Sequence, residues 1–187
     1  MKTLNQRLFF CVNRQLGKRP ALDGLFLVVA HWFIYILFVL CLVWADVTLP
    51  GIWYRLYIKV VLTTIVSGIV VSWMLAMFWV HKRPMGEFPE AKFLFQPYKN
   101  KSFPSDHTMI SFLLVFITYF FGAHWFVILL LTFLAGLVGF SRIWVGVHYP
   151  RDVAGGIFFA LVFSYFGYYL VTYISQPLYN HLLLFWR

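Results

Sequence analysis

Charged residues are scarce in this chain of 187 residues, and acidic residues are the scarcest of them. Only 11% of the residues are Asp, Glu, Lys or Arg, whereas a soluble domain carries about 25%. Hydrophobic residues make up 62% of the chain, which is too apolar to cover itself with polar surface in water. The composition excludes a disordered protein, a collagen-like fibre and an ordinary cytosolic enzyme, and it indicates a protein that crosses a membrane several times.

Cysteine is nearly absent as well. The two cysteines, Cys11 and Cys41, give neither a disulfide framework nor a metal-ligand spacing. Six acidic residues against 15 basic ones leave a formal net charge of +9. In a soluble protein this excess suggests nucleic-acid binding. In a chain this apolar it indicates basic residues beside membrane spans and an anionic substrate, so we expect no nucleic-acid partner.

Long apolar runs are abundant. A membrane-spanning helix needs about 20 mainly apolar residues, and three runs reach that length, over 25–45, 60–80 and 153–174. Two shorter runs, over 108–121 and 125–140, are separated by a tight connection. We therefore expect an all-α polytopic membrane bundle with five transmembrane helices, forming a single domain. The expected spans cover about 24–45, 58–80, 105–121, 124–142 and 152–174 of the chain 1–187. The alternative is three spans and a buried helical hairpin.

Residues 1–20 have a different pattern. Apolar side chains recur there every four positions, at Leu4, Leu8, Val12 and Leu16. The basic side chains that fall off this stripe are Arg7, Arg14 and Lys18. The pattern predicts an amphipathic helix that lies in the membrane interface. A secretory signal peptide is rejected, because the first apolar run starts late, is long enough to span and lacks a small-residue cleavage site.

Two connections hold nearly all of the concentrated polar residues. With five spans, the connections 81–107 and 141–152 lie on the same side of the membrane. The first opens with His81, Lys82 and Arg83. A basic membrane anchor explains the first two of these residues about as well as a functional role does.

The first connection ends with Phe-Pro-Ser-Asp-His at 103–107, just before an apolar run. Ser105 is a good N-cap and Asp106 suits the first turn of a helix. Free backbone N–H groups at such a helix start form an anion site. Capping alone explains the serine and the aspartate, but it does not explain His107 beside them.

The second connection contains Arg142, His148 and Asp152 where the fourth span meets the fifth. Pro150 suits the first position of the fifth helix. Asp152 lies four residues after His148, so its carboxylate is expected to accept the Nδ1 proton and to aim Nε2 outward. An imidazole held in this way is a nucleophile or a base.

Two histidines, two arginines, one carboxylate and a helix start are thus expected on one membrane face. A metal site is the rival interpretation, but it would put a metal cation beside two arginines, so we expect no metal. A phosphoryl group suits these residues better. Arginines and amides neutralise its oxygens, one histidine attacks it, and the other protonates the leaving oxygen.

These residues resemble the three motifs of the type 2 phosphatidic acid phosphatase superfamily, which also includes the vanadium haloperoxidases. The third motif of that family is Ser-Arg, five residues, His, three residues and Asp. Every position of it is matched, by Ser141, Arg142, His148 and Asp152. The second motif is Pro-Ser-Gly-His, and residues 104–107 match it with Asp106 in place of the glycine.

The first family motif, Lys, six residues and Arg-Pro, is matched in part. Arg83 and Pro84 match, but the lysine position falls on Ala76, so one phosphate contact of the family pattern is missing. Lys82 is a candidate to supply that charge from a new direction. The missing lysine and the Phe-Pro-Ser-Asp-His of 103–107 are similar to the small bacterial undecaprenyl pyrophosphate phosphatases, which recycle the lipid carrier of cell-wall synthesis.

The resemblance implies an integral-membrane lipid phosphatase that needs no cofactor. It implies that His148 attacks phosphorus and forms a phosphohistidine, that Asp152 orients His148, and that His107 protonates the leaving oxygen and then activates water. The implied phosphate-binding residues are Arg83, Arg142, Lys82, Ser105 and the amides near Asp106. The expected partner is a membrane lipid, with undecaprenyl pyrophosphate as the substrate. Phosphatidylglycerol phosphate, phosphatidic acid and a lipid A phosphate are alternatives, and a transporter of an anionic lipid is the alternative outside the enzymes.

Orientation is predicted differently by two arguments. With five spans, 12 of the 15 basic residues lie on the side of the two polar connections, which by the positive-inside rule faces the cytoplasm. The resemblance implies a multi-pass protein of the bacterial inner membrane with an extracytoplasmic active site, and we follow the resemblance. The sequence predicts no oligomeric state.

Overall fold

The described residues of the computed structural model, 3–95 and 101–184, are mostly helical. The expectation of an all-α membrane bundle is confirmed. The helices in chain order are α1 (Leu4–Asn13), α2 (Pro20–Thr48), α3 (Gly51–Phe78), α4 (Pro84–Glu87), α5 (Asp106–Phe120), α6 (Trp125–Trp144), α7 (Pro150–Leu170) and α8 (Gln176–Leu184), with a π-helical segment at Val171–Ser175 between the last two.

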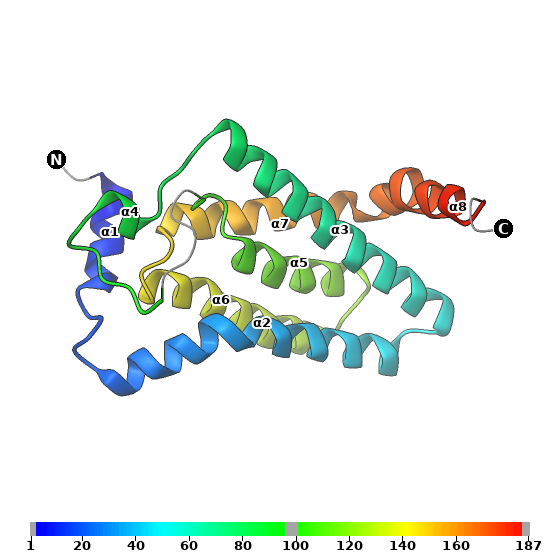
Figure 1. Cartoon of the computed structure of the whole chain (residues 1–187). Helices are drawn as coiled ribbons and strands as arrows, with labels where there is room; N and C mark the ends of the chain where they lie inside the picture. Colours follow the sequence, from blue (N-terminus) through cyan, green and yellow to red (C-terminus); the bar gives the residue numbers. More distant parts are fainter. Residues whose placement is uncertain (1–2, 96–100, 185–187) are drawn as a thin grey trace.

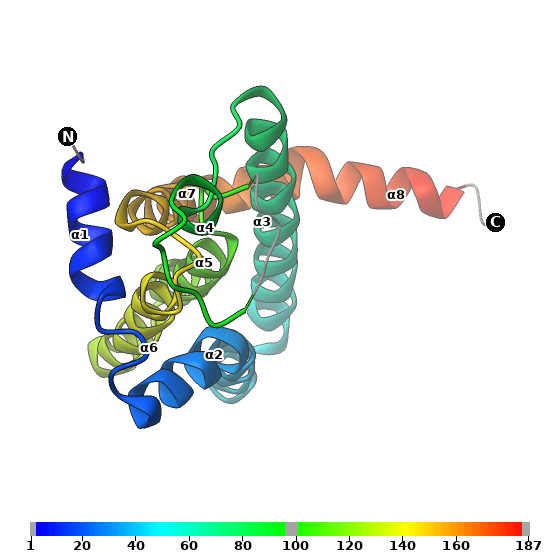
Figure 2. The same cartoon turned by 60° about the vertical axis from the view of Figure 1, so that its left-hand side comes forward.

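Helix α5 is the centre of the bundle. It contacts α2, α3, α6 and α7 (Figures 1 and 2). Most of its apolar side chains are buried, including Met109, Leu113 and Ile117, each 0% exposed, and only its last two residues are exposed. A helix that is apolar on all sides needs partners on all sides, and here the four longer helices provide them. The N-terminus of α5 is thereby held at a fixed place near one end of the bundle.

Four helical segments are long and apolar enough to cross a membrane, namely Pro20–Thr48, Gly51–Phe78, Trp125–Trp144 and Pro150–His181. Helix α5 has 15 residues, and at 1.5 Å per residue it is about 22 Å long. The apolar core of a bilayer is about 30 Å thick, so α5 alone falls short of spanning it. The count of five spans therefore stays a prediction.

Helix α3 starts seven residues before the predicted second span. The prediction began near the start of the apolar run at 60, and the basic residues Arg55 and Lys59 lie before that run. A long basic side chain can keep its stem on an apolar surface while its charge reaches a polar partner. The Lys59 ammonium does so by donating to Gln176 Oε1 at 2.6 Å. Basic residues at a span end thus lie inside the helix.

The N-terminal segment is shorter as a helix than the predicted 1–20. Helix α1 ends at Asn13, and Gly17 takes a left-handed backbone with φ of 85° before α2 begins. The helix packs through Phe9 and Phe10, whereas Leu4 of the predicted stripe is 73% exposed. Leu8 is 50% exposed and Leu16 is 2% exposed, so only the first part of the stripe has the exposure that an interfacial helix presents to lipid. The interfacial role itself stays a prediction.

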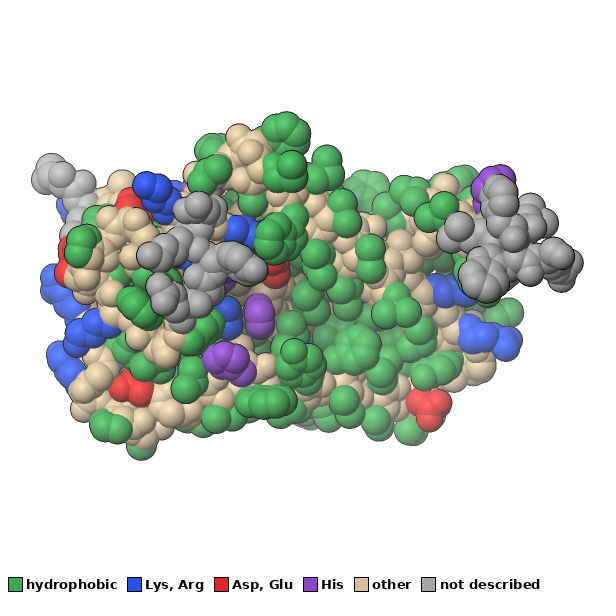
Figure 3. Space-filling model, viewed as in Figure 1, with side chains coloured by type: hydrophobic (Ala, Val, Ile, Leu, Met, Phe, Trp, Pro, Cys, Tyr) green, Lys and Arg blue, Asp and Glu red, His purple; other side chains and the backbone are tan. Residues whose placement is uncertain are grey.

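The two ends of the bundle differ in polarity. The chain starts at the end that carries α1 and α4, and α8 lies toward the other end (Figure 1). Figure 3 shows most of the basic, acidic and histidine side chains toward the α1 end, with an apolar band over the middle. An apolar band of this kind matches the hydrocarbon region of a bilayer.

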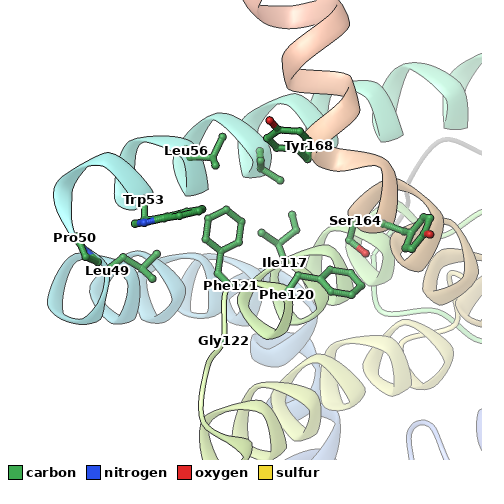
Figure 4. Close-up of a pocket in the computed structure, with 12 residues that line it drawn as sticks. Leu49, Pro50, Trp53, Leu56, Ile117, Phe120, Phe121, Gly122, Ser164 and Tyr168 are labelled. Carbon is green, nitrogen blue, oxygen red and sulfur yellow. The ribbon is translucent and has the colours of Figure 1, made fainter.

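Two hollows of opposite character lie toward the two ends. The larger, about 700 Å³, is formed by the start of α3, the end of α5 and part of α7 (Figure 4). Its lining is aromatic and aliphatic apart from Ser164 and the tyrosine hydroxyls, so it offers no cation to hold a phosphate. The smaller one lies at the N-terminus of α5 and contains the residues that the sequence motifs predict.

Candidate active site

A basic pocket of about 280 Å³ opens at the N-terminus of α5. It is lined by His31, Trp73, Arg83, Phe95, Lys101, Asp106, His107, Arg142 and His148. The structure thus brings together five of the predicted site residues, which come from three separate parts of the chain. Predicted Ser105 and Asp152 are fully buried beside it, whereas the predicted Lys82 is exposed and is not part of the lining.

His148 and Asp152 lie next to one another at the base of this pocket. They are 2% and 0% exposed, and His148 Nδ1 is 3.7 Å from Asp152 Oδ2. That distance is longer than a hydrogen bond, so a shift of under about 1 Å would form the predicted contact. Ser102 Oγ donates to the same carboxylate oxygen at 2.5 Å, and the Tyr149 backbone N–H donates to it at 2.8 Å. The carboxylate is therefore fixed independently of His148.

The Nε2 atom of His148 accepts a hydrogen bond from Arg83 Nη1 at 3.3 Å. A guanidinium only donates, so Nε2 carries the lone pair and the proton of the neutral ring is assigned to Nδ1. Burial, helped by the nearby Arg83 and Arg142, lowers the pKa of His148 to about 4 against the opposing effect of Asp152. His148 is therefore neutral at pH 7, with its nucleophilic nitrogen toward the pocket.

Arg83 is held by two backbone carbonyls. Its Nε donates to Lys101 O at 2.9 Å and its Nη1 donates to Val147 O at 3.2 Å. Burial lowers the pKa of this guanidinium and the two nearby carboxylates oppose that effect, but an arginine stays charged in a protein. The side chain therefore joins the two polar connections and places one cation beside His148.

Arg142 lies in the last turn of α6 and is 3% exposed. Its Nη1 donates to Ala30 O of α2 at 3.0 Å, and its guanidinium lies 5.3 Å from the ring centroid of Phe95. A cation near an aromatic ring is stabilised there. Arg142 thus lines the α2 side of the pocket.

The start of α5 supplies His107 and Asp106. His107 is half-buried and lines the pocket, one residue into the helix. The first N–H groups of α5 have no carbonyl partner within the helix, so they add positive potential at the same place. The Asp106 carboxylate is already occupied, because Ser72 Oγ and Lys101 Nζ each lie 2.5 Å from its oxygens.

Ser105 occupies the predicted N-cap position, but its side chain does not cap the helix. Its hydroxyl instead accepts from Thr108 Oγ1 at 3.0 Å, and its backbone N–H donates to Asp152 O at 3.0 Å. Ser105 therefore ties the start of α5 to the start of α7, and with it His107 to Asp152. The predicted side-chain cap was wrong, because the Ser105 hydroxyl accepts from the Thr108 hydroxyl and not from a backbone N–H of the first turn.

Sequence reasoning missed two residues that directly precede the Phe-Pro-Ser-Asp-His segment. Lys101 is 7% exposed and lines the pocket, and Ser102 is fully buried against Asp152. The available signal was their adjacency to that segment. Among residues 3–95 and 101–184, no three His, Cys, Asp or Glu side chains are grouped as metal ligands.

A helical membrane bundle with a buried, basic pocket around a neutral histidine is a scaffold for phosphoryl chemistry. The profile of the PAP2 superfamily matches residues 56–176, which contain all three motifs. The chain belongs to the PAP2 superfamily.

Curated relatives are similar over different lengths. The chain is 29% identical over 164 residues to the putative undecaprenyl-diphosphatase YbjG of Escherichia coli, covering 87% of this chain and 80% of that protein. It is 33% identical over 104 residues to undecaprenyl-diphosphatase BcrC of Bacillus subtilis, covering 54% of this chain and 50% of that protein. The bacitracin transport permease protein BcrC of Bacillus licheniformis is 36% identical over 97 residues, covering 50% of this chain and 45% of that protein. The chain thus spans about half the length of the two Bacillus relatives.

Solved structures share the fold. LpxE of Aquifex aeolicus superposes with a TM-score of 0.73 at 27% identity, over 89% of this chain and 95% of that one. A PAP2-type phosphatidylglycerolphosphate phosphatase of Bacillus subtilis superposes with a TM-score of 0.64 at 22% identity, over 94% of this chain and 88% of that one.

Proposed function

We propose that this protein hydrolyses undecaprenyl pyrophosphate, removing its terminal phosphate through a phosphohistidine intermediate. The observation that carries the proposal is the neutral His148, placed in a basic pocket with the buried Asp152 behind it. A phosphoryl group needs cations for its oxygens and an unprotonated nucleophile for its phosphorus, and the pocket supplies both.

In the proposed first step, His148 Nε2 attacks the terminal phosphorus. An N–P bond forms, the P–O bond to the leaving lipid phosphate breaks, and His107 donates a proton to that oxygen. Arg83 and Arg142 neutralise the transferring oxygens, and Asp152 receives the Nδ1 proton in a hydrogen bond as the ring gains charge.

In the proposed second step, His107 takes a proton from a water molecule that attacks the phosphohistidine. The N–P bond breaks, inorganic phosphate leaves, and His148 returns to its neutral form with His107 protonated again. Each proton given in the first step is recovered in the second, so the cycle closes without a metal or a cofactor.

The choice of substrate is supported by two relatives, YbjG and BcrC of Bacillus subtilis, whose names state undecaprenyl-diphosphatase. The phosphatidylglycerolphosphate phosphatase among the structural neighbours keeps that lipid as the second candidate substrate. A transporter of an anionic lipid is the candidate outside the enzymes, and the Bacillus licheniformis relative is named as a transport permease, although for bacitracin.

We also propose that the protein lies in the bacterial inner membrane with its pocket facing away from the cytoplasm. A lipid carrier that has delivered its sugar cargo is freed on the outer leaflet, so an enzyme that reads its head group must be reachable there. A pocket near the polar end of the bundle suits a pyrophosphate, because a charged head group is costly to draw into hydrocarbon.

The test is phosphate release by the purified protein from a panel of lipids in detergent, with EDTA present throughout. We expect undecaprenyl pyrophosphate to give the highest kcat/KM, and His148→Ala to abolish release from every lipid. A higher kcat/KM for phosphatidylglycerol phosphate would show that this lipid, and not undecaprenyl pyrophosphate, is the substrate. Binding of the lipids without any release by the wild-type protein would favour the transporter, and activity that requires added magnesium would refute the mechanism.

A further inference from the structure

A third cation lines the pocket besides Arg83 and Arg142. The Lys101 side chain is 8% exposed, and its ammonium lies 2.5 Å from Asp106 Oδ2 and 5.4 Å from the ring centroid of Trp73. A lysine is rarely buried this far without a partner, because removing its charge from water is costly. Burial lowers the pKa of Lys101, and Asp106 is the main group that opposes this effect.

The backbone fixes Lys101 relative to the catalytic residues. Its carbonyl oxygen accepts from Arg83 Nε at 2.9 Å, and the next residue, Ser102, donates from its hydroxyl to Asp152 at 2.5 Å. The Ser102 backbone N–H also donates to His81 O at 2.9 Å. The segment that carries the ammonium is therefore tied both to the arginine and to the carboxylate that act on His148.

We propose that Lys101 binds the anionic head group of the substrate, and that Asp106 is the counter-ion that holds the ammonium in the pocket until the head group arrives. This inference rests on the proposed phosphatase function, adds Lys101 to that site and gives Asp106 a role there. The Asp106 side chain is 25% exposed, so it is the more accessible partner of the pair. A phosphate group carries more negative charge than one carboxylate, so it can replace Asp106 as the partner of the Lys101 ammonium.

The two departures from the family motifs meet at this pair. Ser72, which donates to Asp106 at 2.5 Å, lies four residues before Ala76 on α3, so positions 72 and 76 share one helix face. A lysine at 76 would approach the same region from α3, and a glycine at 106 would leave no carboxylate there. Lys101 with Asp106 thus supplies a cation from the loop at the place where the family motifs supply it from the helix.

The competing explanation is that Lys101 merely neutralises Asp106. Four variants separate the two: Lys101→Met, Asp106→Asn, the double variant, and the double variant with Ala76→Lys added. We expect Lys101→Met to lower kcat/KM at least tenfold, chiefly through KM, and the double variant to stay at least tenfold low. We expect the added lysine at 76 to recover at least threefold. Lys18→Met, an exposed charge loss at the same end of the bundle, is the matched control and should stay within twofold of the wild type.

Wild-type kcat/KM in a folded double variant would overturn the proposal, because it would leave Lys101 only the task of neutralising Asp106. No recovery by lysine at 76 in a folded protein would overturn the charge-based account as well. Thermal unfolding in detergent reports folding for each variant. Should Lys101→Met fail to fold with Asp106 unpaired, the double variant carries the test, since it removes both charges. Failure of the proposed function is distinguishable, because the wild type itself would then release no phosphate.

Discussion

The Nε2 atom of His148 carries the proposed chemistry, and Arg83 covers it before the substrate arrives. The 3.3 Å hydrogen bond from Arg83 Nη1 occupies the lone pair that must attack phosphorus. In the proposed mechanism the incoming phosphoryl oxygens draw this N–H away, because a charge-assisted hydrogen bond to phosphate is stronger than one to a neutral imidazole. Binding of the head group would then free the Nε2 lone pair of His148 by drawing the Arg83 N–H away from it.

At the same scale, the pH dependence of the first step follows from the pKa of His148, which burial lowers to about 4. A lowered pKa keeps the imidazole neutral in mild acid, so nucleophilic reactivity is lost only as the pH falls through about 4. With a substrate whose good leaving group needs little protonation by His107, we expect the single-turnover rate of phosphoenzyme formation to change less than about twofold between pH 7 and pH 5.5. Rapid alkaline quench with radiolabelled substrate measures this rate, because the N–P bond of a phosphohistidine survives in base.

An ordinary histidine would behave differently. A nucleophile with a pKa near its usual value of about 6.5 would lose most of its neutral form between those two pH values. An acid limb centred near pH 6.5 in the single-turnover rate would therefore contradict the buried environment assigned to His148. The integrity of the protein at pH 5.5 is checked by returning a sample to pH 7 before assay.

Among the elements, the short connection between α6 and α7 depends on one glycine. Gly146 has φ of 84°, and a Cβ built on it would lie 2.0 Å from the Lys92 carbonyl oxygen. The Leu94 N–H donates to Val145 O at 3.2 Å, which holds the two connections against each other. The close approach places His148, two residues further on, and a side chain at 146 would push the connections apart.

We expect Gly146→Ala to lower the free energy of unfolding by about 1–3 kcal/mol, because it combines a left-handed backbone with a backbone clash. We also expect kcat/KM to fall in the protein that remains folded, since His148 moves with the connection. Thermal unfolding in detergent and lipid phosphatase assays measure the two effects. Gly136→Ala is the control, because a Cβ at Gly136 meets nothing within 4 Å and alanine favours a helix interior. Equal behaviour of the two variants would refute the packing argument.

The elements also show why the sequence predicts some of the site and not the rest. The pairing of His148 with Asp152 follows from a spacing of four residues, and the N-terminus of α5 follows from its capping pattern. The contact of Lys101 with Asp106 depends on how a loop folds back onto a helix start, which no helical periodicity encodes. Ser102 reaches Asp152 across 50 positions of sequence. Lys82 was a candidate to supply the charge missing at Ala76, but neighbouring residues in an extended segment point in opposite directions, and it is Arg83 that enters the pocket.

At the scale of the whole molecule, apolar runs predict the helices well and their limits less well. The run lengths predicted the positions of α2, α3, α5, α6 and α7 because long apolar stretches need helical hydrogen bonding in a membrane. They could not predict the early start of α3, whose basic residues are accommodated at a span end. They also could not predict that α1 would pack through Phe9 and Phe10, because these two residues lie off the stripe of apolar residues at every fourth position.

Orientation is the molecule-scale prediction. In a background with Cys11 and Cys41 replaced, a cysteine at the exposed Lys82 should react in intact cells with a membrane-impermeant thiol reagent. A cysteine at Gly51, the first residue of α3 after the α2–α3 connection, should be protected until the membrane is opened. Position 51 suits the comparison because a side chain there meets no neighbour within 4 Å.

The reversed labelling pattern would place the pocket in the cytoplasm, as the excess of basic residues at that end suggests. It would count against recycling of a carrier lipid at the outer leaflet while leaving the phosphatase chemistry intact. Labelling of both cysteines in intact cells would refute a connection on each side of the membrane.

The measurement that tests the central claim most directly is capture of the covalent intermediate. Protein mixed with a substrate labelled in its terminal phosphate is denatured within milliseconds, and the acid-labile, base-stable phosphate is mapped by peptide analysis. We predict label on His148 alone. His107→Ala should still form this adduct from a substrate with a good leaving group, because such a group needs little protonation. His148→Ala should form none. Label on His107, or hydrolysis by His148→Ala at a rate near that of the wild type, would contradict the account.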